Sequence, residues 1–210
     1  MEVTILKKEE FSLRSPGMIG EEKFRQYGVF VPLIEDMGAT YLLFEKRSEK
    51  LRHHPGEICF PGGKLEVGES LQECAIRETM EELQITSAQL EVIGPGDIYI
   101  SPFNLMIYPF LGRIMDYKNT FGKEEVEEII KIPFDYFKNY QPKRFETKLI
   151  HEPPNDFPYE WIPGGTKYPW AKGSYDLLFY SYEDYIIWGM TAQIVWSMVG
   201  LIEEYNILSH

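Results

Sequence analysis

Apolar runs bounded by turn residues divide this chain into a series of expected strands. Residues 28–34 and 40–46 flank the polar segment 35–38, a pattern that predicts a β-hairpin. Residues 57–60 lead into Pro61-Gly62-Gly63, which predicts a turn after a short strand. Further strand-like runs cover residues 90–93, 99–100, 105–114, 126–133 and 175–182.

A helix is predicted over residues 70–83, where apolar and acidic side chains recur at helical spacing. One side is apolar at i, i+4 and i+7, which gives the helix a face to bury. The opposite side carries glutamates at i, i+3 and i+4, which a helix brings together. The apolar residues are Ile76, Met80 and Leu83, and the glutamates are Glu78, Glu81 and Glu82.

These glutamates repel one another, and Arg77 is the cation that this helix places beside them. Like charges at such spacing destabilise a helix unless something cationic lies among them. The divalent cations Mg²⁺ and Mn²⁺ prefer oxygen ligands of this kind. A solvated acidic helix face is the alternative, and the glutamates alone do not separate the two interpretations.

Two further helices are expected, a short one at residues 135–139 and a long apolar one at 185–202. The second contains Thr191, Gln193 and Ser197 and is as short as a membrane span can be. We therefore interpret it as a buried helix that packs on the sheet. Residues 1–28 are polar and mixed, and predict an N-terminal strand followed by a connector.

The segment from Gly63 to Glu82 has a spacing that resembles a known family signature. It reads glycine, five residues, Glu69, seven residues, Arg77-Glu78, two residues and Glu81-Glu82. This resembles the Nudix box of hydrolases that act on nucleoside diphosphates linked to another group. Two positions depart from that pattern: Thr79 replaces a bulky aliphatic residue, and Gln84 replaces a glycine. A left-handed helix end costs a glutamine more than a glycine.

The resemblance implies an α/β fold, the Nudix α/β/α sandwich with a mixed β-sheet between helices. By position, Glu78 and Glu82 look like the principal ligands of Mg²⁺ or Mn²⁺, with Glu81 sharing in coordination. Arg77 resembles the arginine that pairs with Glu69 and holds the loop against the helix. The resemblance also implies that the backbone carbonyl of Gly62 or Gly63 completes the site, and we take both glycines as substrate-binding residues.

A base that takes the proton from the attacking water is the remaining catalytic requirement. Glu78 and a glutamate of the run 124–128 are the candidates, and we take Glu125 as the representative of that run. The alternative for the run is an ordinary exposed acidic turn. The sequence does not choose between the two candidate bases.

The segment upstream of the box indicates the substrate. It reads Arg47-Ser48, three residues, Arg52, three residues, glycine, three residues and Phe-Pro-Gly-Gly, which looks like the signature of the coenzyme A pyrophosphatase branch. Residues 187–192, Ile-Trp-Gly-Met-Thr-Ala, and the threonine at 79 are similar to elements of that branch, whereas Phe44 and Glu45 depart from it.

The chemistry of this segment is compatible with coenzyme A (CoA), which carries a 3′-phosphate and a pyrophosphate. Arg47 and Arg52 are its candidate phosphate-binding residues, because arginine binds phosphate through two hydrogen bonds and keeps its charge. The resemblance implies hydrolysis of CoA, acyl-CoA or oxidised CoA to 3′,5′-ADP and a 4′-phosphopantetheine. Hydrolysis of ADP-ribose or NADH is one alternative. A non-catalytic nucleotide sensor is another, although all the box glutamates are present.

Composition bounds the class of protein. The chain has 210 residues and 44% hydrophobic content, which predicts one domain over residues 1–210. Its net charge of −12 disfavours nucleic acid and anionic membranes as partners. The two cysteines, Cys59 and Cys74, are interpreted as small core residues in a reducing compartment. No signal peptide opens the chain, so the expected location is the cytoplasm.

Residues 140–174 hold many prolines, glycines and aromatic side chains. We expect a long irregular segment that serves either as a lid or as a subunit interface. A loop packed on its own domain is equally compatible with the pattern. A homodimer is an expectation from the family resemblance alone.

Overall fold

The computed structural model describes residues 10–208 and has a mixed β-sheet with a helix on each face. The sheet is built from β1 (Arg25–Asp36), β2 (Ala39–Arg47), β3 (Ile58–Cys59), β4 (Gly62–Lys64), β5 (Leu90–Pro95), β6 (Tyr99–Ser101), β7 (Leu105–Ile114) and β8 (Val126–Pro133). Strand β1 pairs parallel with β7 and antiparallel with β2 and β4. The expected hairpin is therefore confirmed, and so is the mixed sheet.

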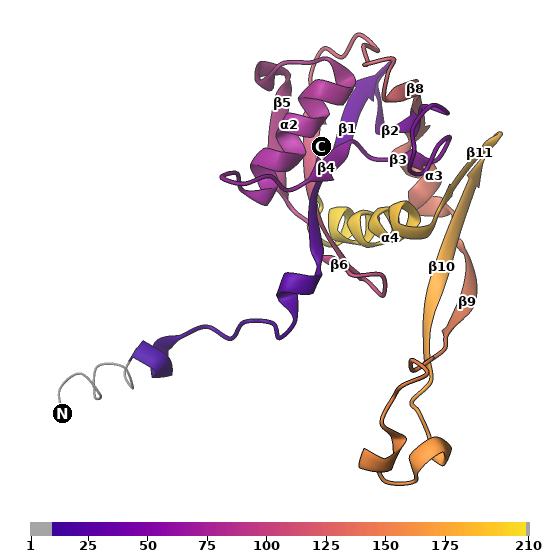
Figure 1. The fold of residues 1–210 in the computed structure, drawn as a ribbon. Coiled ribbons are helices and arrows are strands. Elements are labelled where there is room, and N and C mark those ends of the chain that lie inside the picture. Colours follow the sequence, from indigo (N-terminus) through magenta and orange to yellow (C-terminus); the bar gives the residue numbers. More distant parts are fainter. Residues whose placement is uncertain (1–9, 209–210) are drawn as a thin grey trace.

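Helices α2 (Leu71–Leu83) and α4 (Gly189–Glu204) lie on opposite faces of this sheet (Figure 1). Adjacent residues of β2 show the division, because Leu43 packs in the cluster on the α2 side and Phe44 in the cluster on the α4 side. The middle residues of β1 and β2 are buried on both faces of the sheet, which explains the continuous apolar runs of these two strands. The α/β/α sandwich expected from the family resemblance is confirmed.

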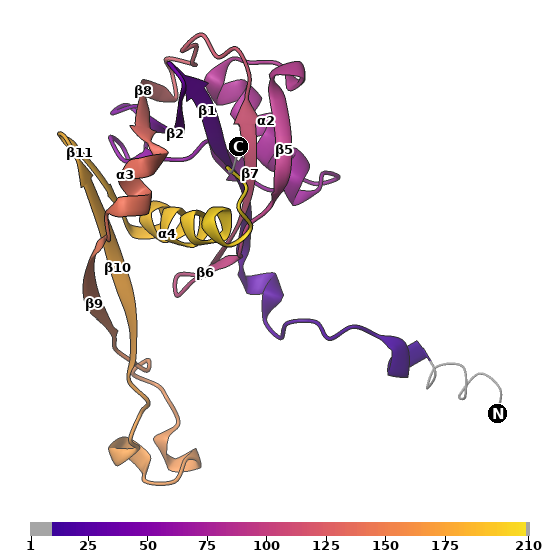
Figure 2. The same cartoon turned by 180° about the vertical axis from the view of Figure 1, so that it is seen from behind.

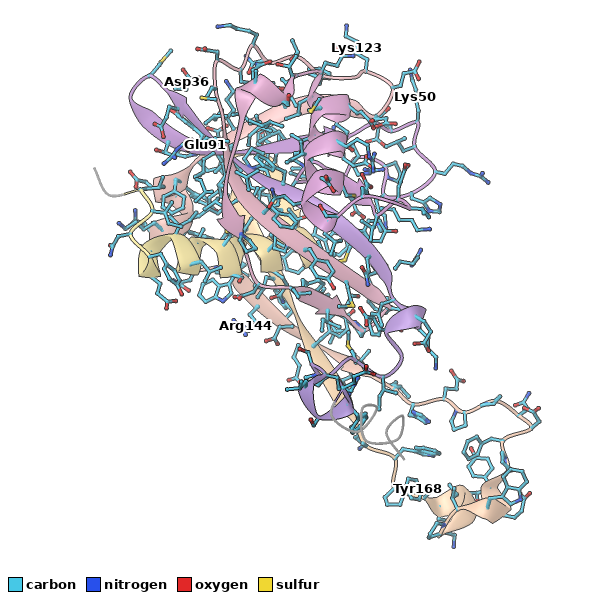
Figure 3. The ribbon with its side chains drawn as sticks, turned by 90° about the vertical axis from the view of Figure 1, so that its left-hand side faces the viewer. Asp36, Lys50, Glu91, Lys123, Arg144 and Tyr168 are labelled. Atoms are coloured by element: carbon cyan, nitrogen blue, oxygen red, sulfur yellow. The ribbon has the colours of Figure 1, made fainter. Side chains whose placement is uncertain are left out.

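A second sheet joins β9 (Lys143–Leu149), β10 (Gly173–Tyr182) and β11 (Tyr185–Trp188). Strands β9 and β10 form a long ribbon that extends away from the main sheet, and residues 10–24 extend in another direction (Figure 2). The ribbon ends in the short 3₁₀ helices η3 (Tyr159–Trp161) and η4 (Gly165–Lys167), and Tyr168 lies at this far end (Figure 3). The remaining elements are α3 (Phe134–Asn139), η1 (Glu21–Lys23) and η2 (Ser87–Gln89).

Three expectations need correction, and a fourth falls partly outside the described residues. Pro61-Gly62-Gly63 is not a simple turn, because Gly62 and Gly63 form β4 and pair with Val29 and Gly28 of β1. The segment 140–174 is not irregular throughout, because it contains β9. The predicted helix 185–202 begins only at Gly189, after β11. Residues 10–24 contain helical turns and no strand, while residues 1–9 lie outside the described part.

Helix α2 accommodates the two residues, Thr79 and Gln84, that depart from the box pattern. Gln84 adopts the left-handed conformation, with φ of 51°, that a glycine would adopt at the same place. The hydroxyl of Thr120 donates to the carbonyl of Leu83 at 2.7 Å, which satisfies one of the last backbone acceptors of the helix. Thr79 is buried, and its hydroxyl donates to the carbonyl of Ala75.

Both cysteines are free thiols, and Cys74 is fully buried as expected. Among the described residues, no helix is long and apolar enough to cross a membrane.

Gly28 allows α2 to lie directly on β1, and its replacement tests this close approach. A Cβ at Gly28 would lie 2.2 Å from the carbonyl oxygen of Leu71 and 2.9 Å from the amide nitrogen of Ala75. We expect Gly28→Ala to lower the free energy of unfolding by roughly 1–3 kcal/mol in urea titrations. Gly200→Ala is the control, because its Cβ would meet nothing within 4 Å on exposed helix, and we expect a gain of up to about 1 kcal/mol. Equal effects of the two substitutions would contradict this account.

Candidate active site

The loop before α2 and the first turn of the helix are fixed by local hydrogen bonds. Ser70 caps the helix by accepting from the amide of Glu73 at 3.3 Å, and the carboxylate of Glu73 accepts from the amide of Ser70 at 2.7 Å. This reciprocal capping box defines where the helix starts. Glu69, just before the cap, accepts from the amide of Glu66 at 2.9 Å. The loop therefore presents the Glu69 carboxylate toward the helix.

Arg77 joins this loop to the glutamates of the helix. Its guanidinium donates to both carboxylate oxygens of Glu69, at 2.8 and 3.0 Å. It also donates to Glu78 at 2.8 Å and to Glu81 at 3.4 Å. The hydrogen bonds from Arg77, with that from the amide of Glu66, lower the pKa of Glu69 to about 2. The structure therefore has the Glu69–Arg77 contact that the resemblance implied, and the same arginine also contacts two of the helix glutamates.

Glu82 is the most buried glutamate of the box, with only 4% of its surface exposed. Its carboxylate accepts a hydrogen bond from the amide of Gly62 at 2.9 Å. Burial, followed by the neighbouring charge of Glu45, raises the pKa of Glu82 to about 9. A carboxylate in these surroundings is ionised at neutral pH only when positive charge approaches it.

Glu78 and Glu81 lie further toward solvent on the same helix. The side chain of Glu78 is 19% exposed, and burial raises its pKa above the usual range. A Cβ at Gly63 would lie 2.1 Å from the carboxyl carbon of Glu78, so the glycine provides the room that this carboxylate occupies. Glu81 is 60% exposed. The carbonyl of Gly63 accepts a hydrogen bond from the thiol of Cys74 at 3.4 Å.

Glu125 is brought to this region by the loop that precedes β8. The amide of Gly122 donates to the carbonyl of Glu82 at 2.8 Å, and the amide of Ser48 donates to the carbonyl of Glu125 at 2.8 Å. The charge of Glu125 raises the pKa values of Glu78 and Glu82, although it is a smaller cause than burial. Lys50 and Lys123, from the two loops joined by these bonds, lie at the same end of the molecule (Figure 3).

Glu45 is a member of this group that the sequence reasoning missed. It lies on β2, is 1% exposed, and accepts a hydrogen bond from the thiol of Cys59 at 3.5 Å. Burial raises the pKa of Glu45 to about 7. Its position as an acidic residue inside the apolar run 40–46 was the available signal, but the run was interpreted only as a strand.

The carboxylates around α2 have the chemistry that a hard divalent cation requires. Glu45, Glu78, Glu82 and Glu125 all act on one another electrostatically, so a cation among them would relieve their repulsion. Among residues 10–208, no three acidic, histidine or cysteine side chains already converge on one point. Glu78 instead faces Arg77, and Glu82 faces the amide of Gly62.

A cavity of about 390 Å³ opens beside Gly62 on the α4 side of the sheet. Arg47, Gly62 and Cys59 line it, together with Arg25, His53 and His54. A neighbouring cavity of about 420 Å³ shares Arg25 and His54 and is lined by aromatic side chains from the main sheet and β10. Of the predicted substrate-binding residues, Arg47 and Gly62 line the first cavity, whereas Gly63 and the exposed Arg52 line neither. Sequence reasoning did not select Arg25, His53 or His54.

The family model of the NUDIX domain matches residues 24–151, which is more than half of the 210 residues. The chain therefore belongs to the Nudix domain family. The match includes β1 to β8, α2 and α3, and it ends just beyond β9.

Individual relatives agree with this assignment. The peroxisomal coenzyme A diphosphatase NUDT7 of Mus musculus is 34% identical over 134 residues, which are 63% of this chain and 56% of that protein. An uncharacterized Nudix hydrolase, NudL of Yersinia enterocolitica, is 30% identical over 169 residues, 80% of this chain and 76% of the relative. A solved MutT/nudix family protein from Enterococcus faecalis has the same fold, with a TM-score of 0.52, 14% identity and coverage of 97% of this chain and 69% of its own.

The buried carboxylates predict how the stability of the metal-free protein depends on pH. The pKa values of Glu45 and Glu82 are raised from 4.5 to about 7 and about 9, so the folded state retains protons that the unfolded chain releases above pH 4.5. Stability in EDTA should therefore fall as pH rises from about 5 to 9, by up to about 1.4 kcal/mol per pH unit for each group. Denaturant titrations at several pH values measure this slope.

Glu82→Gln should make the decline shallower, because it removes one of the two groups and retains an acceptor for Gly62. Glu124→Gln is the matched control, since Glu124 is exposed. A slope in Glu82→Gln equal to that of the wild type would rule out this explanation.

Proposed function

We propose that this protein is a metal-dependent hydrolase of a pyrophosphate bond and that coenzyme A is its substrate. The observation that carries the proposal is the position of Gly62 between two parts of the site. Its amide binds the carboxylate of Glu82, and its backbone lines the cavity that also contains Arg47. A pyrophosphate in the cavity would thus lie beside the acidic helix.

Mg²⁺ or Mn²⁺ at Glu78, Glu81 and Glu82 would neutralise the pyrophosphate charge and lower the pKa of a bound water. Arg77 keeps Glu69 and Glu78 in place from the loop side, with contacts of 2.8 Å to each. Arg47 would bind phosphate oxygens from the cavity side. Glu78 or Glu125 would take the proton from the attacking water.

Coenzyme A is proposed for two reasons. The spacing from Arg47 to Gly63 resembles the coenzyme A pyrophosphatase branch, and a mouse relative is named as a coenzyme A diphosphatase. The two neighbouring cavities also offer a polar region and an aromatic region for a long substrate. The same box serves ADP-ribose or NADH, and these remain the alternative substrates. Binding without turnover is disfavoured, because Glu69, Glu78, Glu81 and Glu82 are all present.

Compartment and assembly stay predictions. The cytoplasmic location was inferred from sequence, whereas the mouse relative is named peroxisomal and an Arabidopsis thaliana relative mitochondrial. We likewise propose that the ribbon around 140–174 serves as a lid or as a subunit interface, and that the protein forms a homodimer.

The proposed reaction is tested by incubating the purified protein with coenzyme A and Mg²⁺ or Mn²⁺. We expect 3′,5′-ADP and 4′-phosphopantetheine to appear together, to be absent in EDTA, and to fall by orders of magnitude in Glu82→Gln. Chromatography against standards measures both products. Turnover of ADP-ribose or NADH in place of coenzyme A would leave the chemistry intact and refute the substrate. Near-normal activity of Glu82→Gln would refute the metal assignment.

Arg47 and Arg52 are expected to act on different phosphates. Because Arg47 lines the cavity beside Gly62, Arg47→Ala should lower kcat/KM for both CoA and dephospho-CoA, roughly ten- to a hundredfold. Arg52→Ala should lower kcat/KM only for CoA, because dephospho-CoA has no 3′-phosphate. Lys50→Ala, an exposed cation of the same loop, is the control. An unchanged preference in Arg52→Ala would remove that residue from the site.

A further inference from the structure

Glu45 is a buried carboxylate whose hydrogen-bonding capacity is only half used. It is 1% exposed, and its Oε1 atom accepts from the thiol of Cys59 at 3.5 Å. Its Oε2 atom is buried and has no hydrogen-bond partner within residues 10–208. A thiol is a weak donor, so this contact offsets little of the cost of burying a charged group. Glu45 therefore lacks a partner that its burial demands.

The pleat of β2 aims Glu45 at helix α2. Leu43, two residues earlier, packs in the cluster that contains Ala75 and Leu83 of α2. Since side chains of a strand alternate between faces, Glu45 projects toward the same helix as Leu43. The negative charges of Glu82 and Glu78, both on that helix, interact with the carboxylate of Glu45. Glu45 thus approaches the predicted metal ligands from the sheet, opposite to the solvent side.

Arg47 does not neutralise Glu45 by a hydrogen bond. Its charge acts on Glu45, yet its Nε atom is also buried and without a partner in the described part of the chain. Two groups of opposite charge therefore lie near each other, each with an unused polar atom. A cation for the carboxylate and an anion for the guanidinium would satisfy both. The cavity lined by Arg47 is open to such an anion.

We propose that Oε2 of Glu45 is a further ligand of the divalent cation bound by Glu82 and Glu78. This inference rests on the proposed function, because it assumes a cation at the box glutamates. It adds a carboxylate donor from β2 to the carboxylate donors of α2. The cation would then bind between the strand and the helix, and its charge would supply the partner that Oε2 lacks.

The experiment measures Mn²⁺ binding without substrate, by electron paramagnetic resonance of free Mn²⁺, in the wild type, Glu45→Gln and Glu45→Thr. We expect both variants to bind Mn²⁺ at least tenfold more weakly. Glu91→Gln is the matched control for the loss of one negative charge, because Glu91 is exposed and pairs with Arg113 on the surface of β5 and β7. It should bind Mn²⁺ as the wild type does.

Thermal unfolding separates a ligand from a structural residue. Without metal, Glu45→Gln should have a Tm at least as high as that of the wild type, because it keeps the size of the side chain and removes a carboxylate whose burial is costly. On addition of Mn²⁺ the rise in Tm should be smaller in the variants than in the wild type. A structural role alone would instead lower the metal-free Tm and leave the Mn²⁺-induced rise unchanged.

The outcomes distinguish this inference from the proposed function. If the wild type and both variants bind Mn²⁺ equally, Glu45 is no ligand, whereas the metal-dependent reaction stands. If the wild type binds no Mn²⁺, the proposed metal dependence fails and the inference fails with it. Glu45→Gln preserves the size of the side chain, so it tests the proposal even if Glu45→Thr does not fold.

Discussion

The burial of carboxylates between α2 and the sheet is the constraint on which this structure depends. Glycines allow the approach: a Cβ at Gly28 or Gly63 would lie 2.1–2.2 Å from a heavy atom of α2, and a Cβ at Gly62 would lie 2.5 Å from the carbonyl oxygen of Gly28 in β1. The close packing removes water from Glu82, and a carboxylate without water needs either a proton or a cation. The packing of α2 on the sheet therefore completes the core on that side and also makes a positive charge beside Glu82 stabilising.

The opposite face of the sheet supplies the place where an anion can enter. Parallel pairing sets Arg25 of β1 beside Leu105 of β7, and both residues line the two cavities. Helix α4 closes these cavities through Met190 and Thr191 near its start. The net charge of −12 is therefore no obstacle to an anionic ligand, because cationic side chains line the cavity while many acidic ones lie elsewhere.

The spacing of apolar and polar residues predicted those helices and strands whose ends are set by interactions between neighbouring residues. The helix expected at 70–83 is observed as Leu71–Leu83 with Ser70 as its cap, and the strands Leu105–Ile114 and Val126–Pro133 have the predicted ends. Nonlocal pairing was not predictable in the same way. Strand β9 is largely exposed and owes its conformation to β10, while β4 forms because two glycines fit against β1. The acidic position inside the apolar run 40–46 marked Glu45 as unusual, but it did not show that the side chain would face α2.

The loops around the site connect its parts into one unit. The backbone bond from Ser48 to Glu125 joins the basic loop to the loop before β8, and the bond from Gly122 to Glu82 joins that loop to α2. Gly62 then links the helix to the cavity, because its amide holds Glu82 while its backbone faces the cavity. A negative ligand beside Gly62 and a cation at Glu82 would therefore attract each other across a single backbone segment, so that binding of either favours binding of the other.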